Sequence, residues 1–375
     1  MIEIKEVKSK KDLKMFLEFP AFLYKGDPNY VQELYAVQRL MFNRKKYPFY
    51  THSKADLFLA YRDKEVSGRI AVIRNNNHIF HTGEKCGFFG FFESVNDHEV
   101  SKALLDIAVS RIKSEGLTSI KGPENFTTND SCGFLISGFD TPPVVMMPYN
   151  KVYYDDLMIS YGFKKEIDLY SYLMENDNIL ASSSHELILK KYYDKLTSGG
   201  VTFRNINYKN LREEVIPFRE VYNESNKGNW GFLPLTDREF RETAEMFEKF
   251  VPDKLMLFAE KDKRMIGFIV ALPDLNQVFG HIRSGKLFPT GIFKYLYYRK
   301  KITKGRILIL GILDEYRNKG VDLILYKKIQ ENLNSLGIYT AEACYVMENN
   351  KKMNSIIEKI GGVKVKEYRI YKLEF

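Results

Sequence analysis

One short segment near the carboxyl terminus carries the residues best suited to chemistry. An apolar run from Ile307 to Leu313 is followed by Arg317, Lys319 and Gly320, and a helix-forming stretch begins at Val321. The first turn of a helix presents unpaired amide donors and the positive end of the helix dipole, so it favours phosphate groups. Glycine lets the backbone approach a ligand without an intervening Cβ. The pattern therefore predicts a strand that leads into a phosphate-binding loop, although basic residues and glycine also occur in ordinary turns.

The elements around this segment occur twice along the chain. Residues 60–70 and 259–269 align at a constant offset, and each contains an Asp-Lys pair that predicts the turn of a β-hairpin. Near the end of each half come an asparagine, a helix-like stretch, a glycine stop and a tyrosine-rich strand, at 169–173 and 368–373. Several features in one order indicate two tandem copies of one fold.

The middle of each copy predicts the fold class. A strand at 87–92 precedes a helix at 100–114, and a strand at 307–313 precedes a helix at 321–335, with a glycine just past each helix. Strand, helix and strand in that order imply a parallel crossover beside the antiparallel hairpin. We expect an α/β chain of two tandem domains, each with a mixed, largely antiparallel sheet flanked by helices.

The length of the chain agrees with two domains, because 375 residues exceed one ordinary core. Residues 176–184 are polar and rich in serine, and a short amphipathic stretch follows before two glycines. We therefore expect a first domain at 1–175, a linker with a short helix at 176–200, and a second domain at 201–375.

The second half resembles the GNAT superfamily of acyl-CoA N-acyltransferases. The R/Q-x-x-G-x-G/A loop of that family is similar to Arg317, Gly320 and position 322. The N-x-x-A-x-x-x-Y-x-K-x-G helix of the family is similar to this chain at Asn350, Met353, Ile357, Lys359 and Gly361. The resemblance covers residues 201–375 and reaches the first half only through the internal repeat.

The resemblance implies an acyl donor and a route for it. The donor would be acetyl-CoA or another acyl-CoA, with an acyl-carrier protein as the alternative. The pantetheine arm would pair with the strand before the loop, and a strand amide would polarise the thioester carbonyl. The residues implied in donor binding are Gly311, Ile312, Leu313, Arg317, Asn318, Lys319, Gly320, Val321 and Asn350.

The acceptor implied by the resemblance is a small amine or an amino-acid-like molecule, which must lose a proton to a base. Tyr345 and Glu260 are the candidate catalytic residues, and packing or solvent exposure explains each of them as simply. Asn229 and Trp230 are candidates for the acceptor pocket, with an aromatic core contact as the alternative for Trp230.

Two positions depart from the family pattern. Asp322 stands where the family has a small residue, and we expect it to point away from the donor and serve the helix N-terminus. Ile357 stands where the family has a tyrosine that reprotonates the leaving thiolate. A thiolate leaves tolerably without such an acid, because its pKa is about 8.5.

The first half lacks the loop. When the two crossovers are aligned on their helix ends, Asn96 to Glu99 stands opposite Arg317 to Gly320, with no glycine and with two acidic residues. We therefore expect the first half to be non-catalytic and the chain to hold one thioester site. A turn-rich stretch at 133–143 is either a lid or, as we favour, a structural loop.

Composition excludes some classes and leaves others open. The net charge of +9 and a pI of about 9.0 suit nucleic acid, an anionic membrane, a phosphorylated small molecule or an ordinary solvated surface. The charge is spread along the chain without a nucleic-acid motif, so we do not expect nucleic acid as a partner. The alternative to an enzyme is a catalytically silent protein that binds a thioester or another protein.

The remaining signals concern metal and location. The three cysteines are widely spaced, and a polar turn explains His78 and His81 better than a metal does, so no metal site is expected. The amino terminus alternates charged and apolar residues, and the longest apolar runs are too short to span a bilayer. We expect a cytoplasmic protein without a membrane span.

Overall fold

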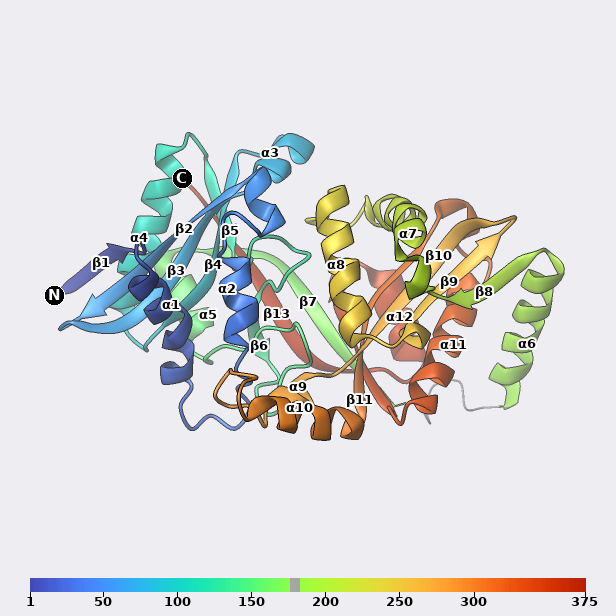
Figure 1. The fold of residues 1–375 in the computed structure, drawn as a ribbon. Helices are drawn as coiled ribbons and strands as arrows, with labels where there is room; N and C mark the ends of the chain where they lie inside the picture. The colour runs from blue at the N-terminus through green and yellow to red at the C-terminus, as the bar shows by residue number, and fades with distance from the viewer. Residues whose placement is uncertain (176–182) are drawn as a thin grey trace. The chain divides into compact units, whose positions relative to one another are not determined.

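The computed structural model describes residues 1–175 and 183–375, so the start of the expected linker, 176–182, lies outside the described residues. The chain forms two compact units. Unit 1 comprises residues 1–169, 276–299 and 366–375, and unit 2 comprises residues 170–275 and 300–365. Figure 1 shows the helices and strands of both units.

Unit 1 is a mixed sheet flanked by helices. Its strand order is β1-β2-β3-β4-β5-β13-β7, and β6 pairs with β13 as well. The sheet is antiparallel except between β4 and β5 among the pairs with a known register. Its strands are β1 (Ile2–Glu6), β2 (Lys54–Arg62), β3 (Glu65–Arg74), β4 (Cys86–Ser94), β5 (Ser119–Gly122), β6 (Phe134–Ser137), the first part of β7 (Lys164–Glu175) and most of β13 (Val363–Glu374). Its helices are α1 (Lys10–Leu23), α2 (Tyr35–Met41), η1 (Pro48–Thr51), α3 (Asn76–Thr82), α4 (His98–Ser114), α5 (Tyr154–Tyr161), α9 (Asn276–Phe279) and α10 (Gly291–Tyr298).

Unit 2 has the same plan. Its strand order is β7-β12-β11-β10-β9-β8, where β7 contributes its second part. Strands β11 and β12 run parallel, and the pairs from β11 to β8 are antiparallel. Its other strands are β8 (Val201–Asn205), β9 (Met256–Lys261), β10 (Arg264–Pro273), β11 (Lys304–Ile312) and β12 (Thr340–Met347). Its helices are α6 (Ser183–Ser198), η2 (Tyr208–Asn210), α7 (Leu211–Asn226), α8 (Asp237–Phe250), η3 (Asp253–Leu255), η4 (Arg299–Lys301), η5 (Asp314–Tyr316), α11 (Val321–Ser335) and α12 (Lys351–Lys359). The expected fold class is confirmed in both units.

The two hairpins repeat each other in detail. The turn residues Asp63 and Lys64 have φ angles of 52° and 72°, and Asp262 and Lys263 have 51° and 64°. Two positive φ angles in a row give the tight turn that suits the twist of a hairpin. Each second strand also bulges at the equivalent place, directly after Val66 and directly after Met265. A shared bulge supports descent of the two halves from one fold, because bulges are retained features.

The closing strands are exchanged relative to the order of the sequence. The last strand, β13, lies beside β5 in unit 1, with Tyr371 opposite Gly122. The closing strand of the first half, β7, contributes residues 170–175 to unit 2, beside β12. The expected division at 175 and 201 gave each half its own closing strand. Periodicity identifies a strand but not its neighbour, so the exchange could not be seen in the sequence.

Helices α11 and α7 pack on opposite faces of the sheet in unit 2. A Cβ added at Gly305 would meet Leu333 of α11, and one added at Gly311 would meet Ser225 of α7. We call these the α11 face and the α7 face. Helix α8 starts with a capping box formed by Thr236 and Glu239, which satisfies its first amides.

Candidate thioester-binding site

The parallel pair in unit 2 separates part-way along its length. Strands β11 and β12 pair only from Lys304 to Ile307 and from Thr340 to Ala343. Beyond these residues each strand continues, to Ile312 and Met347, without pairing to the other. The separation leaves backbone on β11 for an extended ligand to pair with.

A bulge in β11 marks the point of separation. Val270 and Ala271 are consecutive in β10, yet they pair with Ile309 and Ile307. Leu308 is therefore the additional residue, and it changes which face the following side chains occupy. Gly305 faces α11, whereas Gly311 faces α7, because of this bulge.

Backbone amides of β11 beyond the bulge face the separation. The amide of Leu313 donates to the carbonyl of Ile266 in β10 at 3.0 Å. Amides alternate in direction along an antiparallel strand, so those of Leu310 and Ile312 point away from β10. These amides are the strand donors that an acyl thioester would meet.

The loop after β11 leads into α11, and no side chain in the described chain caps the N-terminus of that helix. Gly320 has a φ angle of 88° and stands at the N-cap of α11. The first intrahelical bond runs from the amide of Ile324 to the carbonyl of Gly320. The preceding amides of the first turn are the donors that favour an anion.

Gly320 is buried, contrary to the surface position that its loop suggests. A Cβ at this position would lie 2.4 Å from the ring of Tyr192 in α6. The positive φ angle alone also disfavours any other residue. Helix α6 therefore packs on the loop, and glycine is required there by packing as well as by the backbone.

The basic residues of the loop have different partners. Arg317 donates to the carbonyls of Ile312 at 3.3 Å and Ser225 at 2.9 Å, so it fastens the loop to β11 and α7. Lys319 is exposed, with its ammonium 5.3 Å from the ring centre of Tyr316. Asn318, at φ 61°, accepts a hydrogen bond from Lys352 at the start of α12. Lys319 and Lys352 bring positive charge to the uncapped helix.

Gly311 faces α7, and the acceptor candidates Asn229 and Trp230 follow the end of that helix. A Cβ at Gly311 would lie 2.3 Å from the ring of Phe268 and 2.4 Å from Oγ of Ser225, so packing with α7 explains this glycine. Asn229 and Trp230 follow within five residues of Ser225. Asn229 is exposed and donates to the side chain of Asn226 at 2.9 Å, and Trp230 is half-buried.

The other expected site residues are dispersed. Tyr345 lies on the part of β12 beyond its pairing with β11, with the guanidinium of Arg306 5.9 Å from its ring centre. Glu260 lies on β9, two strands from β11, where it accepts from Arg204 at 2.6 Å. Asn350 accepts from the amide of Met353 at 3.2 Å and caps α12. The structure brings Tyr345 to the separated strands and holds Glu260 elsewhere.

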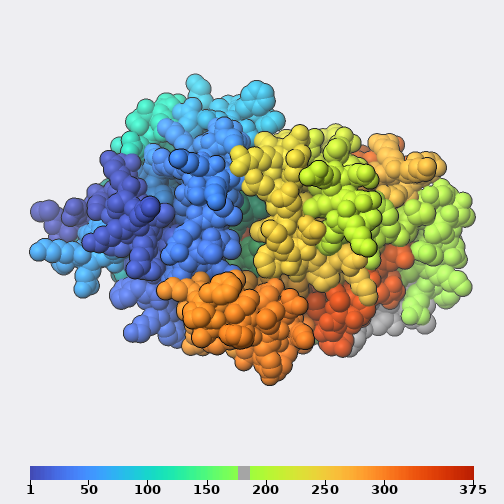
Figure 2. All heavy atoms as spheres, viewed as in Figure 1, coloured from blue at the N-terminus to red at the C-terminus, as the bar shows by residue number. Residues whose placement is uncertain are grey.

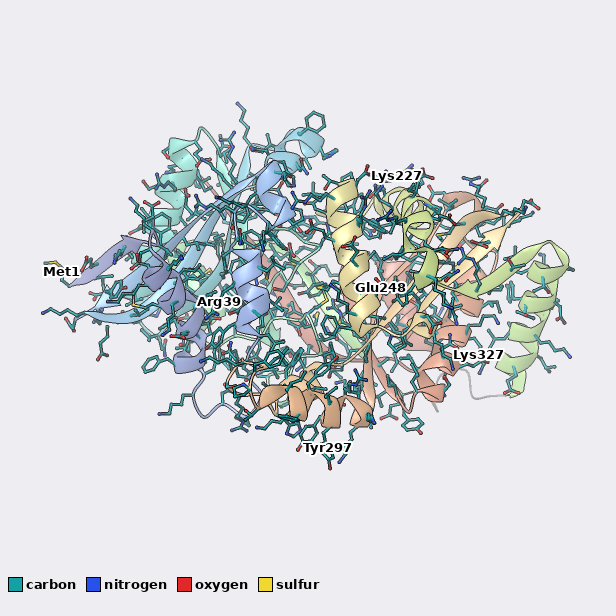
Figure 3. The ribbon with its side chains drawn as sticks, viewed as in Figure 1. Met1, Arg39, Lys227, Glu248, Tyr297 and Lys327 are labelled. Carbon is teal, nitrogen blue, oxygen red and sulfur yellow. The ribbon has the colours of Figure 1, made fainter. Side chains whose placement is uncertain are left out.

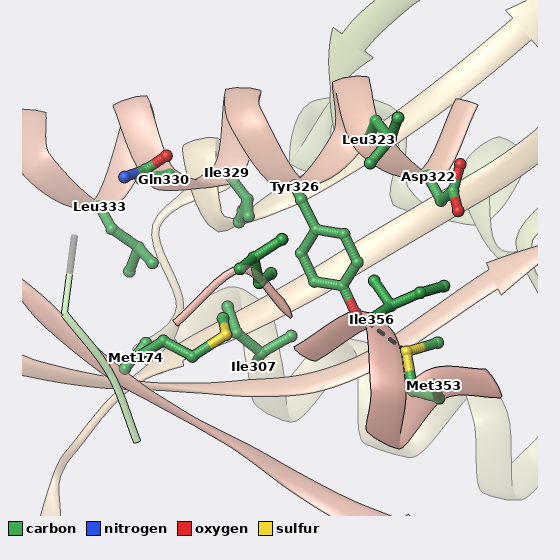
Figure 4. Close-up of a pocket in the computed structure, with 12 residues that line it drawn as sticks. Met174, Ile307, Asp322, Leu323, Tyr326, Ile329, Gln330, Leu333, Met353 and Ile356 are labelled. Carbon is green, nitrogen blue, oxygen red and sulfur yellow. Dashed lines mark hydrogen bonds between the residues drawn. The ribbon is translucent and has the colours of Figure 1, made fainter. Parts of the chain in front are cut away.

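A narrow apolar hollow runs along α11 on its own face of the sheet (Figure 4). It encloses about 30 Å³. Its lining comes from the second part of β7, from β11 and β12, and from helices α11 and α12. The lining residues are Met174, Ile307, Asp322, Leu323, Tyr326, Ile329, Gln330, Leu333, Ala341, Met353, Ile356 and Ile360.

The hollow corrects the role expected of Asp322. This carboxylate lines the hollow near Tyr326 and makes no cap bond to α11. Burial, and to a smaller extent the charge of Asp322, raises the pKa of Tyr326 well above its usual range. The hydroxyl of Tyr326 points to the sulfur of Met353 at 3.8 Å (Figure 4). Asp322 therefore belongs to the lining of the hollow and does not serve as a side-chain cap of α11.

A buried charged cluster occupies the α7 face at the same level. Ala341 lines the hollow, so the next residue of β12, Glu342, faces α7. Glu342 is 1% exposed, accepts from Ser171 at 2.7 Å and is bound by Lys304. Arg306 is 4% exposed and donates to the carbonyl of Cys344 at 3.3 Å. Buried charges of this kind occur in structural ion-pair networks as well as at functional sites.

The residues present fit an acyl thioester with a diphosphate. The separated strands supply outward-facing amides, α11 supplies an uncapped N-terminus, and Lys319 and Lys352 supply positive charge. An extended amide-containing arm would pair with β11 while its diphosphate meets the helix. Among the described residues no group of His, Cys, Asp and Glu could hold a metal ion.

No family model matches the chain, but two curated proteins align along nearly all of it. Protein YghO from Escherichia coli (strain K12) is 33% identical over 369 residues, covering 97% of this chain and 93% of that protein. The bacterial ceramide synthase from Caulobacter vibrioides (strain NA1000 / CB15N) is 30% identical over 372 residues, covering 97% of this chain and 95% of that protein. The chain belongs to the family of these two proteins.

Solved structures show the same fold. One is a tandem GNAT protein from the clavulanic acid biosynthesis pathway, which superimposes with a TM-score of 0.58 at 11% identity. The match covers 100% of this chain and 98% of that protein. A GCN5-related N-acetyltransferase from Sphaerobacter thermophilus has a TM-score of 0.56 at 12% identity, covering 100% of this chain and 95% of its own. The chain therefore has the tandem GNAT fold.

In unit 1 the protein's own chain fills the equivalent separation. Strand β4 pairs with β5 only as far as Phe88. The carbonyl of Phe89 then accepts from the amide of Glu124 at 2.8 Å, and the amide of Phe91 donates to Asn125 at 2.7 Å. A Cβ at Gly90 would lie 2.0 Å from the carbonyl oxygen of Glu124. We call residues 123–126 the plug, because they take the backbone groups that a thioester arm would use.

The helix of unit 1 is also closed to an anion. Asp97 accepts from the amides of Glu99 and Val100 at 2.9 and 3.3 Å and caps α4. A carboxylate thus occupies the donors that remain uncapped at α11. The sequence located this difference, because no glycine stands opposite Gly320.

Sequence reasoning missed two residues of the site. Glu342 had a signal, since it is a charged residue within an otherwise apolar strand. Tyr192 had none, because its contact with Gly320 joins segments far apart in the chain.

None of the helices in the two described stretches combines the length and apolar character needed to cross a bilayer.

Proposed function

We propose that the chain is an N-acyltransferase with one thioester site, in unit 2, and that the site accepts an acyl-CoA. The observation that carries the proposal is the contrast between the two copies. Strand β11 and helix α11 keep their outward-facing donors, whereas the plug and Asp97 occupy the equivalent donors in unit 1. Membership of one family with a ceramide synthase supports acyl transfer to an amine.

The proposed chemistry is a direct attack on the thioester. The amine nitrogen forms a bond to the carbonyl carbon, the carbon–sulfur bond breaks, and the thiolate leaves. The amide of Leu310 is the outward-facing donor nearest the bulge and the paired end that holds Glu342, so we assign it to the thioester oxygen that gains charge, and such donors stabilise that charge strongly. We propose that Glu342, the buried carboxylate of the α7 face, is the base that removes the proton of the amine, directly or through water.

We infer further that the acyl group is long and that the acceptor is a lipid with a primary amine. A ceramide is a fatty acid joined to a long-chain amine, and the relative named for that product covers this chain almost completely. The hollow encloses only about 30 Å³, so a long acyl group would enter it by displacing the lining, which is mostly apolar and extends from Leu323 to Leu333. That length of helix rises about 15 Å, which suits an alkyl chain. The methionines that line it are flexible enough to move aside.

Turnover by the purified full chain tests the proposal. The donors are palmitoyl-CoA, acetyl-CoA and palmitoyl-carrier protein, and the acceptors are a long-chain amino alcohol and a short amine. We expect N-acylated product, identified by mass spectrometry, with palmitoyl-CoA and the long-chain amino alcohol. Glu342→Gln should lower kcat by more than about tenfold with little change in KM for the donor. Absence of amide product from every pair would contradict the enzymatic function and favour a silent thioester-binding protein.

A further inference from the structure

The connection between β10 and β11 is a basic segment without acidic residues. From residue 275 to residue 313 the chain contains no aspartate or glutamate. The equivalent connection in the first half, between β3 and β4, is shorter and consists mainly of α3. The basic residues around α10 and η4 are Arg283, Lys286, Lys294, Arg299, Lys300 and Lys301. The additional length is therefore specific to the second half and strongly cationic.

Large apolar side chains of this segment face outward. The exposed fractions are 74% for Phe288, 72% for Phe293, 47% for Leu296 and 58% for Tyr297. On α10 the last three lie at positions i, i+3 and i+4, which places them on one side of the helix. We call these four residues the aromatic patch. Figure 2 shows the segment on the visible surface, and in Figure 3 the side chain of Tyr297 projects away from the ribbon.

The inner side of the segment is fixed to its own unit. The amide of Tyr35 donates to the carbonyl of Gly285 at 3.0 Å, and Asn276 donates to the carbonyl of Pro143 at 2.9 Å. The rings of His281 and Tyr298 stack at 3.6 Å. These contacts hold α10 in place with the aromatic patch outward, so the exposure is a feature of the folded unit.

The basic residues border the aromatic patch. Lys294 follows Phe293 on α10, and Arg299 follows directly after the helix. Exposed aromatic residues with lysine and arginine beside them are typical of helices that lie in the interface of an anionic bilayer. A helix of 8 residues is far too short to span one.

We propose that the segment from Arg283 to Arg299 docks on the surface of an anionic lipid bilayer, with the aromatic patch in the headgroup region. An acidic carrier protein would account for the charge but not for two phenylalanines more than 70% exposed. A second copy of the chain would bring like charges together across the contact. The docking does not depend on the proposed function, although a lipid amine would be reached from such a surface.

Vesicle sedimentation with the full chain tests the docking. The probes are phosphatidylcholine vesicles with and without phosphatidylglycerol, at low and high salt. We expect binding only with phosphatidylglycerol, weakened by salt. Phe288→Ser with Phe293→Ser, and separately Lys286→Glu with Arg299→Glu, should each weaken binding by at least about tenfold. Phe80→Ser is the matched control, because Phe80 is 82% exposed on α3 and should not matter.

Circular dichroism should show unchanged thermal unfolding for all variants, because the altered side chains are exposed. Failure of the parent protein to bind anionic vesicles would overturn the docking, and so would equal binding by the paired variants. A dimer in light scattering that the same variants dissociate would assign the patch to a second copy instead. Binding of an acidic carrier protein without vesicle binding would also overturn it.

Discussion

Asp97 and Gly320 stand at the start of equivalent helices and give the two halves different capacities. Asp97 supplies a carboxylate to the first amides of α4, whereas Gly320 leaves those of α11 uncapped. Gly320 also accommodates the ring of Tyr192, so its replacement would disturb packing as well as any ligand contact. Lys319 is the better position for a test, because it is exposed and can change charge without repacking.

Glu124 in the plug gives a prediction about pH. Burial raises the pKa of its carboxyl to about 8. Below the unfolded value of about 4.3 the carboxyl is protonated in both states and costs nothing. As pH rises from there to about 8, the unfolded chain releases the proton first, so the folded state loses stability. Glu124→Gln should therefore stabilise the protein by roughly 3 to 5 kcal/mol at pH 8 relative to pH 5.

Denaturant unfolding of parent and variant at the two pH values measures this difference. An equal free-energy difference at pH 5 and pH 8 would mean that Glu124 titrates normally. The sequence could not have suggested the prediction, since the burial of Glu124 follows from the path of the plug and not from its neighbours in the chain.

At the scale of elements, the sequence was informative about local structure. The predicted strand at 307–313 and helix at 321–335 correspond to β11 and α11, and the Asp-Lys turns close both hairpins. Strong periodicity and turn chemistry act over a few residues, so they can be recognised locally. The separation of β11 from β12 and the hollow depend on packing between distant elements, which the sequence does not display.

A larger side chain in the hollow beside α11 and α12 should discriminate between long and short acyl donors. Met353→Trp places a larger side chain in it, so long acyl chains should lose space while an acetyl group should not. We expect kcat/KM for palmitoyl-CoA to fall at least tenfold relative to that for acetyl-CoA, or roughly 1.4 kcal/mol. Met246→Trp, on the exposed side of α8, is the control. An equal loss with both donors would place the acyl chain elsewhere.

At the scale of the whole molecule, the repeat could be inferred from the sequence and the strand exchange could not. The exchange means that the halves cannot be separated at the linker without removing β13 from unit 1. Tyr368, Ile370 and Tyr371 of β13 are at most 1% exposed. Each large buried side chain contributes about 1.5–3 kcal/mol, so their loss rivals the stability of an ordinary domain.

Truncation before β13 tests the exchange. Removal of residues 363–375 should abolish hydrogen-exchange protection in β4 and β5 of unit 1, because β13 pairs directly with β5. Removal of residues 374 and 375 alone is the control and should leave most protection in place. Retained protection after the longer truncation would show that unit 1 does not need the last strand.

The central claim is that one intact thioester site remains, in unit 2, and calorimetry of the full chain with coenzyme A tests it most directly. We predict one binding site per chain. Lys319→Glu should weaken binding at least tenfold, since a charge-assisted contact is worth about 1.5–3 kcal/mol and 1.4 kcal/mol is tenfold. Lys327→Glu, two turns along α11 (Lys327 is labelled in Figure 3), should bind like the parent. Two sites per chain, or unchanged binding by Lys319→Glu, would contradict the account.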